Sequence, residues 1–485
     1  MNLGPVNINS YTSMPVSLEH SWPTEIIRGV VIAVDLCIIL VIGSLYIGQI
    51  ASSNDTEISF VYIYALLIVS ILYFVISSFA GNFEVSCVMR PLKKADDVIV
   101  SIITAFFFFV SIALAFERGE WFPISSMLTL AALCCVVVVA WRFLAFATLK
   151  WLSRRRIIGR RMAILGGGEQ ARRFAQRVRA TQPYFVSVVG VFADGESKPG
   201  ADLEEYPLIG DVAALLSFAR ASQVDDVVVA MPWSADKEVI AAIGLLKELP
   251  VNVYLTTDLI GFELAFRPVM GAFSDLPMFE VVPKPLSGWS SVLKAVEDYL
   301  VAGLLVLALA PLFAIIALLI KLDSAGPVFF KQKRLGFNNK EFSIYKFRSM
   351  YHNQTPETVV RQARKGDPRV TRVGRVIRAT SLDELPQMFT VLNGTMSLVG
   401  PRPHAVSHNE EYGRQIRGYF ARHRVKPGIT GWAQVNGLRG ETDTIEKMEA
   451  RIRHDVYYAD NWSLLFDLRI LVMTALVVLF QKTAY

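Results

Sequence analysis

The chain has 485 residues, and a usual domain size of about 150 residues predicts roughly three units. Hydrophobic residues make up 53% and charged residues 19%, against about 45–50% and about 25% in an average soluble domain. This composition excludes a disordered chain and argues against a purely soluble enzyme. The net charge of +6 suits nucleic acid, anionic lipid or a phosphorylated substrate. The four cysteines have no CxxC spacing, which argues against a disulfide framework or a zinc site: Cys37, Cys87, Cys134 and Cys135.

The N-terminal part is predicted to cross a membrane four times. Residues 1–25 form a polar tail that lacks the basic start and cleavage site of a signal peptide. Within 26–150, four apolar runs are each long enough to span a bilayer as a helix: 28–50, 60–80, 98–116 and 124–148. Basic residues gather after the second and the fourth run. The positive-inside rule therefore places both ends of this bundle in the cytoplasm.

Residues 151–285 are predicted to form a Rossmann-like α/β module with a parallel sheet. Short apolar strands are expected at 162–165, 186–192, 227–230 and 251–256, with a helix at 169–180 after the first. The turn Gly166-x-Gly168-x-x-Ala171 is a weak dinucleotide fingerprint, because the third glycine is alanine and no clear acid ends a second strand. We interpret the module as structural, with Arg172 and Arg173 either binding phosphate or facing solvent.

A fifth apolar run, 299–320, lies in the C-terminal domain, 286–485. Basic residues flank this run on both sides: Lys294, Lys321, Lys331, Lys333 and Arg334. A full span would put the downstream basic region outside, against the charge rule. Because Pro311 removes a helical hydrogen bond, we expect a helix broken at Ala310-Pro311 that returns to the same face. An ordinary fifth span is the alternative. A last apolar run, 463–480, carries Asp467 and Arg469 and is predicted to be a packed or interfacial helix.

The chemistry is concentrated in the C-terminal domain. A strand at 342–350 carries Lys346 and Arg348, and the following segment adds Arg369, Arg372, Arg375 and Arg378. Ser381 and Glu384 have capping-box spacing, but Pro386 would be the fifth helical position in that register. The helix is therefore expected to start either after Ser381 or near Asp383, and in both cases Asp383 and Glu384 lie in its first turn. There the helix dipole and nearby arginines favour ionised carboxylates. Such a pair can attack phosphorus or hold Mg²⁺, and the alternative is a capped helix with surface ion pairs.

Two further motifs point to a phosphate ligand. Arg402 lies between Pro401 and Pro403, which fix the backbone and aim one guanidinium, as suits a pyrophosphate. His404 and His408 have no further ligand cluster, and we interpret them as turn or substrate-edge residues and not as metal ligands. The stretch KPGITGWAQVNG, 426–437, is typical of a stiff functional loop.

These C-terminal motifs resemble those of the bacterial polyprenyl glycosylphosphotransferases, the large monotopic phosphoglycosyl transferases that prime polysaccharide synthesis. The matching stretches within 294–485 are the proline-broken hydrophobic hairpin, SAGPVFFKQKRLG (324–336), YKFRSM (345–350), TSLDELPQ (380–387), SLVGPRP (397–403) and KPGITGWAQVNG (426–437). The N-terminal spans and the degenerate nucleotide-binding fold match the larger members, so the resemblance covers nearly the whole chain. The chain most resembles the GumD and WcaJ type, undecaprenyl-phosphate glucose phosphotransferases. HAVSHNEEY (404–412) and QKTAY (481–485) resemble the xanthan-priming members.

The resemblance implies an α/β membrane protein with a four-helix transmembrane bundle, a Rossmann-like module and a catalytic domain with a re-entrant helix. It implies transfer of glucose-1-phosphate from UDP-glucose to undecaprenyl phosphate, with Mg²⁺ and a covalent sugar-phosphate intermediate. Asp383 then matches the nucleophile, which also faces the metal, and Glu384 completes the dyad and supports the metal. Arg378 and Arg402 match phosphate-binding arginines. Lys346 matches the lysine of the YKFRSM motif, which supports the phosphate-binding site from further away. Ala310 departs from the serine that some relatives have before the kink proline.

The expected location is the bacterial inner membrane, with the catalytic domain facing the cytoplasm. Membrane lipid is an expected partner, nucleic acid is not, and a homodimer stays open. UDP-galactose is the rival donor. A membrane-anchored nucleotide-sugar oxidoreductase or dehydratase is the alternative from another class. It would need a tyrosine and a lysine in YxxxK spacing as its catalytic base, and residues 151–285 lack that motif. A transporter is disfavoured because the four spans hold almost no ionisable residues besides Asp35 and Arg142.

Overall fold

The computed structural model divides into two compact units. The first runs to Arg160 and includes short segments at 182–187 and 272–275, and the second holds the remainder. The structure describes residues 24–50, 56–116, 122–155, 158–181, 185–193, 206, 208–221, 224–256, 278–352, 367–404, 406–438 and 444–480. Most of the predicted polar tail and the QKTAY terminus lie outside these described residues.

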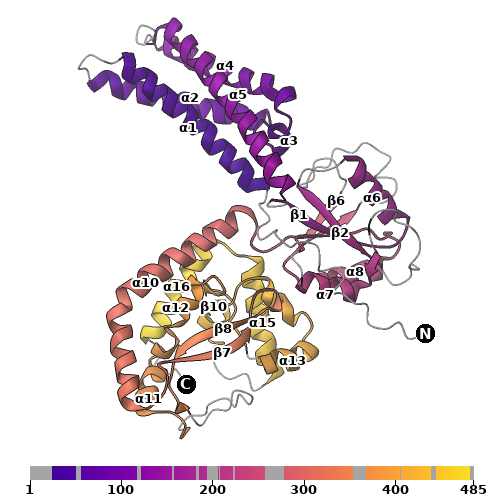
Figure 1. The fold of residues 1–485 in the computed structure, drawn as a ribbon, viewed down its shortest axis with the longest axis vertical. Coiled ribbons are helices and arrows are strands. Elements are labelled where there is room, and N and C mark those ends of the chain that lie inside the picture. The colour runs from indigo at the N-terminus through magenta and orange to yellow at the C-terminus, as the bar shows by residue number, and fades with distance from the viewer. Residues whose placement is uncertain are drawn as a thin grey trace. The chain divides into compact units, whose positions relative to one another are not determined.

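Four long helices of the first unit pack on one shared apolar core (Figure 1). They are α1 (Thr24–Ile50), α2 (Thr56–Phe79), α4 (Pro91–Ala115) and α5 (Ile124–Arg154), with a short α3 (Val85–Val88) before α4. Many outward side chains are apolar as well, among them Ile71, Phe107 and Val136, each more than 60% exposed. Apolar surface of this extent is stable in lipid and not in water. These helices and α10 (Gly288–Asp323) are the five described helices long and apolar enough to cross a membrane.

The two ionisable residues predicted within these helices form one buried ion pair. Arg142 Nη2 lies 2.6 Å from Asp35 Oδ2, and the Tyr73 hydroxyl donates to the same carboxylate at 2.8 Å. Arg142 Nη1 donates to the Asn82 carbonyl oxygen at 2.9 Å. Both charges are thus used in contacts between helices, and this argues against the transporter alternative.

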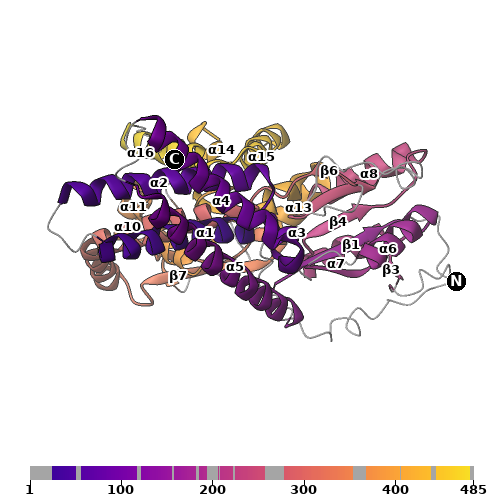
Figure 2. The same cartoon turned by 90° about the horizontal axis from the view of Figure 1, so that it is seen from above.

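The second unit begins with a six-stranded sheet in the order β3-β2-β1-β4-β5-β6. Its strands are β1 (Arg160–Leu165), β2 (Val186–Phe192), β3 (Leu208–Gly210), β4 (Asp226–Val229), β5 (Asn252–Thr256) and β6 (Met278–Val282). The pairs β1–β4, β2–β3 and β4–β5 are parallel, which confirms the expected parallel sheet, and β6 adds an antiparallel edge. Figure 2 shows the sheet beside its helices, α6 (Glu169–Thr181), α7 (Val212–Ala221) and α8 (Asp236–Leu246).

The glycine turn of this sheet has a structural reason. Gly166 has φ +140°, and a Cβ there would lie 2.3 Å from the Ala230 carbonyl oxygen at the end of β4. Only glycine allows this close approach of two strands. At the start of α6, Arg172 Nε and Arg173 Nε lie 2.9 and 3.0 Å from the carboxylate of Glu169. A negative side chain therefore stands in the helix turn where a bound phosphate would otherwise be favoured.

The remaining elements form the C-terminal domain. They are α10, β7 (Phe329–Leu335), η3 (Phe337–Asn339), β8 (Glu341–Phe347), α11 (Arg372–Ala379), η5 (Leu382–Glu384), α12 (Gln387–Leu392), β9 (Ser397–Val399), α13 (Val406–Gln415), η6 (Tyr419–Arg424), β10 (Gly428–Thr430), α14 (Trp432–Val435), α15 (Ile445–Asp460) and α16 (Leu464–Phe480). β7 and β8 form an antiparallel hairpin, and β9 pairs with β10 in parallel. Asp467 of α16 is fully buried, as expected for a packed helix.

The helix α10 contributes to two separate cores of this domain. Ala302 in its first half joins the core that contains β9 and α15, and Phe313 and Ile316 in its second half pack with Phe347 of β8. The prediction of a helix broken at Ala310-Pro311 is wrong, because α10 is one continuous helix that includes Pro311. Figure 1 shows its ribbon changing direction along its length. Proline removes one hydrogen bond and crowds the preceding turn, which bends a helix without ending it when the remaining bonds persist.

The end of α10 is closed by the arginine of the YKFRSM motif. Arg348 Nη2 donates to the Ser324 carbonyl oxygen at 2.6 Å, and Nη1 donates to the Ala325 carbonyl oxygen at 3.0 Å. Gly326, at φ +128°, leaves room for the guanidinium, since a Cβ there would lie 2.1 Å from Nη1. A cation at the C-terminal carbonyls of a helix stabilises it. The SAGP and YKFRSM motifs are thus halves of one helix cap.

Gly166 and Gly168, two positions of the same turn, allow a test of the structural interpretation of the α/β module. A Cβ at Gly168 meets nothing within 4 Å, so we expect Gly168→Ala, like Arg172→Ala, to keep turnover within about twofold of the wild type. Gly166→Ala should instead destabilise the module by about 1–3 kcal/mol through its positive φ and its clash. Turnover and thermal unfolding of the three variants check this. Tightly bound NAD whose removal abolishes turnover would contradict it.

Candidate active site

Two predicted site residues, Lys346 and Arg402, meet around the carboxylate of a third, Glu384. Lys346 Nζ lies 2.8 Å from Glu384 Oε1, and Arg402 Nη2 lies 2.7 Å from the same oxygen. Arg402 Nη1 donates to Glu384 Oε2 at 3.2 Å, so the guanidinium holds the carboxylate with two nitrogens. The side chain of Glu384 is only 13% exposed. A buried carboxylate is stable when it is paired and hydrogen-bonded in this way.

The cations around Glu384 determine its protonation. Burial alone would raise the pKa of Glu384, but Arg402 and Lys346, by charge and hydrogen bonds, hold that pKa well below its usual range. Glu384 is therefore an anion at neutral pH. It fixes the two cationic side chains in place between β8, η5 and the loop after β9.

The neighbouring carboxylate behaves differently. Burial, together with the charge of Glu384, raises the pKa of Asp383 above its usual value, although Lys346, Arg378 and Arg402 act in the opposite direction. The expectation that the helix dipole and arginines would dominate is therefore wrong for Asp383. Among the described residues its carboxylate has no hydrogen-bond partner. A poorly solvated carboxylate with a raised pKa is a stronger nucleophile than an exposed aspartate.

The backbone that presents the acidic pair is not the predicted capped helix. Ser381 is left-handed, at φ 58° and ψ 13°, and its side chain makes no cap hydrogen bond. Residues Leu382–Glu384 form a 3-10 turn, and α12 begins only at Gln387, after Pro386. Proline favours the start of a helix over its interior, which explains why the helix begins beyond the acidic pair. A non-glycine residue at positive φ costs about 1–3 kcal/mol and is typical of a functional turn.

The remaining predicted residues lie around this turn. Arg378 is in the last turn of α11, and its positive charge lowers the pKa of Asp383. Thr371 caps the start of this helix, since its hydroxyl oxygen accepts a hydrogen bond from the Gly374 amide at 2.9 Å. Ala310 and Pro311 do not join the charged cluster. However, Leu309 and Leu312 beside them pack in the same apolar core as Leu382 and Leu385, which flank the acidic pair.

Sequence reasoning missed Arg422, the residue that holds the backbone of Arg402. Its Nη2 lies 2.5 Å from the Arg402 carbonyl oxygen and 2.8 Å from Asp455 Oδ2, and its side chain is only 1% exposed. Its only sequence signal is the basic run at 422–426, before the glycine loop. Arg334, in the KQKRLG stretch, lies near enough to Arg402 for the two positive charges to interact. Burial and the charge of Arg402 lower the pKa of Arg334 to about 10.

His404 is a turn residue, but it does not line an open substrate edge. It is 6% exposed, and its ring contacts the Tyr419 hydroxyl at 2.7 Å and Arg422 Nη1. Burial and the charge of Arg422 lower its pKa well below the usual range, so it is neutral. The side chain of His408 lies outside the described residues.

The acidic pair fits a small, hard cation better than a protein-enclosed metal site. No group of three or more His, Cys, Asp or Glu side chains is gathered for a metal within the part of the chain that the structure describes. Mg²⁺ commonly takes one or two carboxylates together with substrate phosphates. The Asp383 carboxylate can serve as such a ligand directly. Both carboxylate oxygens of Glu384 already accept hydrogen bonds from Lys346 and Arg402, so they are less available to a metal.

Comparisons with known proteins identify the family of this chain. The family described as bacterial sugar transferase matches residues 289–481, and the one described as CoA-binding domain matches residues 78–257. A UDP-glucose:undecaprenyl-phosphate glucose-1-phosphate transferase of Escherichia coli (strain K12) is 39% identical over 366 residues, which cover 75% of each chain. The protein of the same name in Xanthomonas campestris pv. campestris is 38% identical over 353 residues, 72% of this chain and 73% of that protein. The chain therefore belongs to the bacterial sugar transferase family and is an enzyme.

The pH dependence of Lys346 variants tests the electrostatics of the pair. A carboxylate acts as a nucleophile only when it is ionised, so any activity that depends on attack by Asp383 should rise with pH through its pKa. Because Lys346 lowers that pKa, Lys346→Met should shift the acid limb of kcat/KM to higher pH. The same change should lower kcat/KM at neutral pH on the order of 100-fold. Lys333→Met is the matched control, since Lys333 is an exposed lysine of the partner strand β7 whose ion pair in the described structure is with Glu341. An acid limb unchanged in Lys346→Met would refute this assignment.

Proposed function

We propose that the protein transfers glucose-1-phosphate from UDP-glucose to undecaprenyl phosphate, giving undecaprenyl-diphosphate-glucose and UMP. This is the priming step of exopolysaccharide synthesis. The observation that carries the proposal is the Asp383–Glu384 turn, in which one carboxylate is locked between Lys346 and Arg402 and the other is left to react. The names of the relatives, which cover about three quarters of the chain, support the two substrates.

The proposed chemistry proceeds in two displacements at phosphorus. A carboxylate oxygen of Asp383 attacks the sugar-bearing phosphorus of UDP-glucose, and the bond to the bridging oxygen breaks with departure of UMP. The phosphate oxygen of undecaprenyl phosphate then attacks the same phosphorus, and the bond to Asp383 breaks and restores the carboxylate. Such a covalent route suits one site visited in turn by a soluble and a lipid substrate.

The other residues have supporting roles in this proposal. Arg402 and Arg378 bind phosphate oxygens, and Lys346 keeps Glu384 and Asp383 in their ionised forms. Asp383 would hold Mg²⁺ together with the substrate phosphates, and the negative charge of Glu384 would support that position. When bound, Mg²⁺ supplies neutralisation of the charge that develops on the departing phosphate.

The membrane arrangement is also part of the proposal. We infer that α1, α2, α4 and α5 span the bacterial inner membrane and that α10 bends at Pro311 and returns to the cytoplasmic face. The support is the basic residues on both flanks of the apolar run and the bend in α10 (Figure 1). This arrangement keeps the catalytic residues on the side where nucleotide sugars are found and close to the lipid phosphate.

The donor sugar has one rival, and the other enzyme class has lost its basis. UDP-galactose would use the same chemistry, so a donor screen that reads out UMP decides between the two sugars. The membrane-anchored oxidoreductase or dehydratase is replaced by the sugar transferase assignment, which rests on residues 289–481 and on relatives that cover most of the chain.

A labelling experiment tests the role of Asp383. Wild-type protein incubated with UDP-glucose labelled in the sugar, without lipid, should become labelled and lose the label to hydroxylamine, as an acyl phosphate does. Asp383→Asn keeps the shape and removes the nucleophile, so it should take no label and lose turnover by about three orders of magnitude or more. Asp367→Asn is the control and should keep both, because the ion pair that the described residues show for Asp367 is with Arg369, two positions along the chain. A label mapped to another residue would remove Asp383 from this role.

A reporter fusion tests the topology. A reporter joined after residue 340, in the loop before β8, should report the cytoplasm if α10 is re-entrant. Pro311→Leu restores the missing hydrogen bond, so it should straighten α10, and either lower activity or move the reporter across the membrane. A periplasmic signal from the wild-type fusion would refute the re-entrant arrangement and favour a fifth span.

A further inference from the structure

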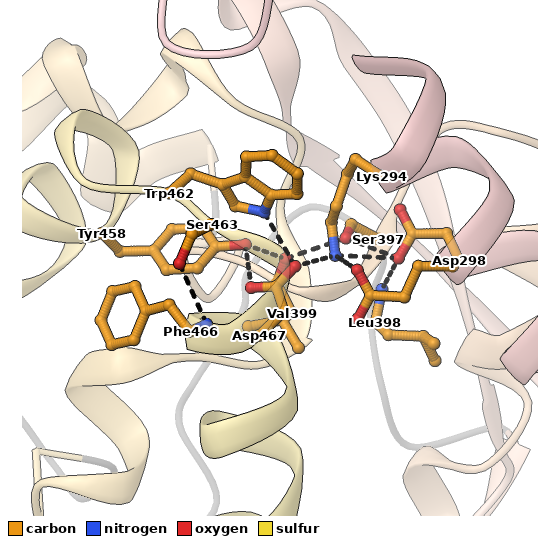
Figure 3. Close-up of polar contacts among 11 residues, drawn as sticks. Lys294, Asp298, Ser397, Leu398, Val399, Tyr458, Trp462, Ser463, Phe466 and Asp467 are labelled. Atoms are coloured by element: carbon orange, nitrogen blue, oxygen red, sulfur yellow. Dashed lines mark hydrogen bonds and ion pairs between the residues drawn. The ribbon is translucent and has the colours of Figure 1, made fainter. Parts of the chain in front are cut away.

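A buried cluster of charges connects α10 to the segment that carries Arg402. Figure 3 shows Lys294 of α10 surrounded by acidic side chains. Its Nζ lies 2.5 Å from Asp467 Oδ2, 3.1 Å from Asp298 Oδ1 and 3.3 Å from Glu297 Oε2. All four side chains are less than 8% exposed. A charged group so deeply buried is costly, and this cluster lies outside the acidic pair of the site.

Within the cluster, Asp298 alone reaches β9. Its Oδ1 accepts a hydrogen bond from the Leu398 amide at 2.9 Å and lies 2.9 Å from the Ser397 hydroxyl (Figure 3). Among the described strands β9 pairs with β10 alone, so the carboxylate takes the place of a second neighbouring strand for the Leu398 amide. Lys294, one helical turn before Asp298, holds that carboxylate in position.

The far end of β9 is fixed by the same cluster. The Tyr458 hydroxyl lies 2.9 Å from the Val399 carbonyl oxygen and 2.8 Å from Asp467 Oδ1. Three residues later the chain reaches Arg402, and the Gly428 amide donates to the Pro401 carbonyl oxygen at 3.0 Å. A short strand held on both edges and followed by a proline-bounded arginine leaves its guanidinium little freedom.

We propose that Asp298 is a positioning residue for Arg402, and thereby sets how tightly the enzyme holds the diphosphate of its nucleotide sugar. The inference rests on the proposed function, in which Arg402 binds a phosphate. Because Asp298 belongs to the same helix as Pro311, it also joins the apolar part of α10 to the phosphate-binding arginine. A shift of this helix would therefore be passed to Arg402 through one carboxylate and one strand.

The test compares neighbouring carboxylates on one lysine. Asp298→Ala should weaken binding of UDP, and kcat/KM for UMP release, by about tenfold, as the loss of a charge-assisted hydrogen bond implies. Asp298→Asn keeps an oxygen that can accept from Leu398 and Ser397, so it should stay within about threefold of the wild type. Glu297→Gln removes an equal charge beside Lys294 without touching β9, and should also stay within about threefold.

A double variant separates positioning from simple loss of stability. If Asp298 acts through Arg402, then Asp298→Ala/Arg402→Ala should bind UDP no more weakly than Arg402→Ala alone. Should Asp298→Ala not yield folded protein, Ser397→Ala replaces it, with an expected loss of about threefold that is again absent in the Arg402→Ala background. Additive losses, wild-type UDP affinity in Asp298→Ala, or an equal loss in Glu297→Gln would each overturn the proposal. UDP binding needs no turnover, so a wild type that binds UDP but releases no UMP would refute the proposed function alone.

Discussion

The ion pairs of Glu384 are the interaction on which the site depends. One largely buried carboxylate accepts from Lys346 of β8 and from both terminal nitrogens of Arg402. Removing either cation would leave a buried anion short of partners, which costs more than the pair contributes. The hairpin, the turn after α11 and the loop after β9 are therefore held together by electrostatics at the place where they meet. The apolar cores around them need only bring these three segments near.

The same constraint separates the two neighbouring acids. Glu384 is kept ionised by its cations, and its fixed negative charge helps raise the pKa of Asp383. Two carboxylates whose pKa values are moved in opposite directions take different roles. The lowered one anchors cations, and the raised one has the basicity that nucleophilic attack requires. The left-handed Ser381 turns the chain so that both can point to the same cluster, at a cost in backbone energy that these ion pairs offset.

Local features of the fold were predictable from the sequence, and distant partnerships were not. Short apolar segments with helical patterns between them predicted β2 and the parallel sheet, since such signals depend on neighbouring residues. The capping box failed because the spacing of Ser381 and Glu384 does not reveal that Ser381 adopts positive φ. The sequence singled out Arg402 and Glu384 as candidate site residues in two separate motifs. The hydrogen bond from the Leu398 amide to Asp298, in contrast, joins residues 100 positions apart. No periodicity reports a contact of that separation.

The bend in α10 (Figure 1) gives this helix a geometric role beyond its length. The 22 residues of its apolar run would extend about 33 Å as a straight helix, close to the hydrocarbon thickness of about 30 Å, so length alone permits a full span. Two structural demands favour a bend. The first half of α10 must present Asp298 and Ala302 toward β9, and the second half must present Phe313 and Ile316 toward β8 and the acidic turn. A single helix meets both demands when a proline between them changes its direction, and each half then packs in a different apolar core of the C-terminal domain.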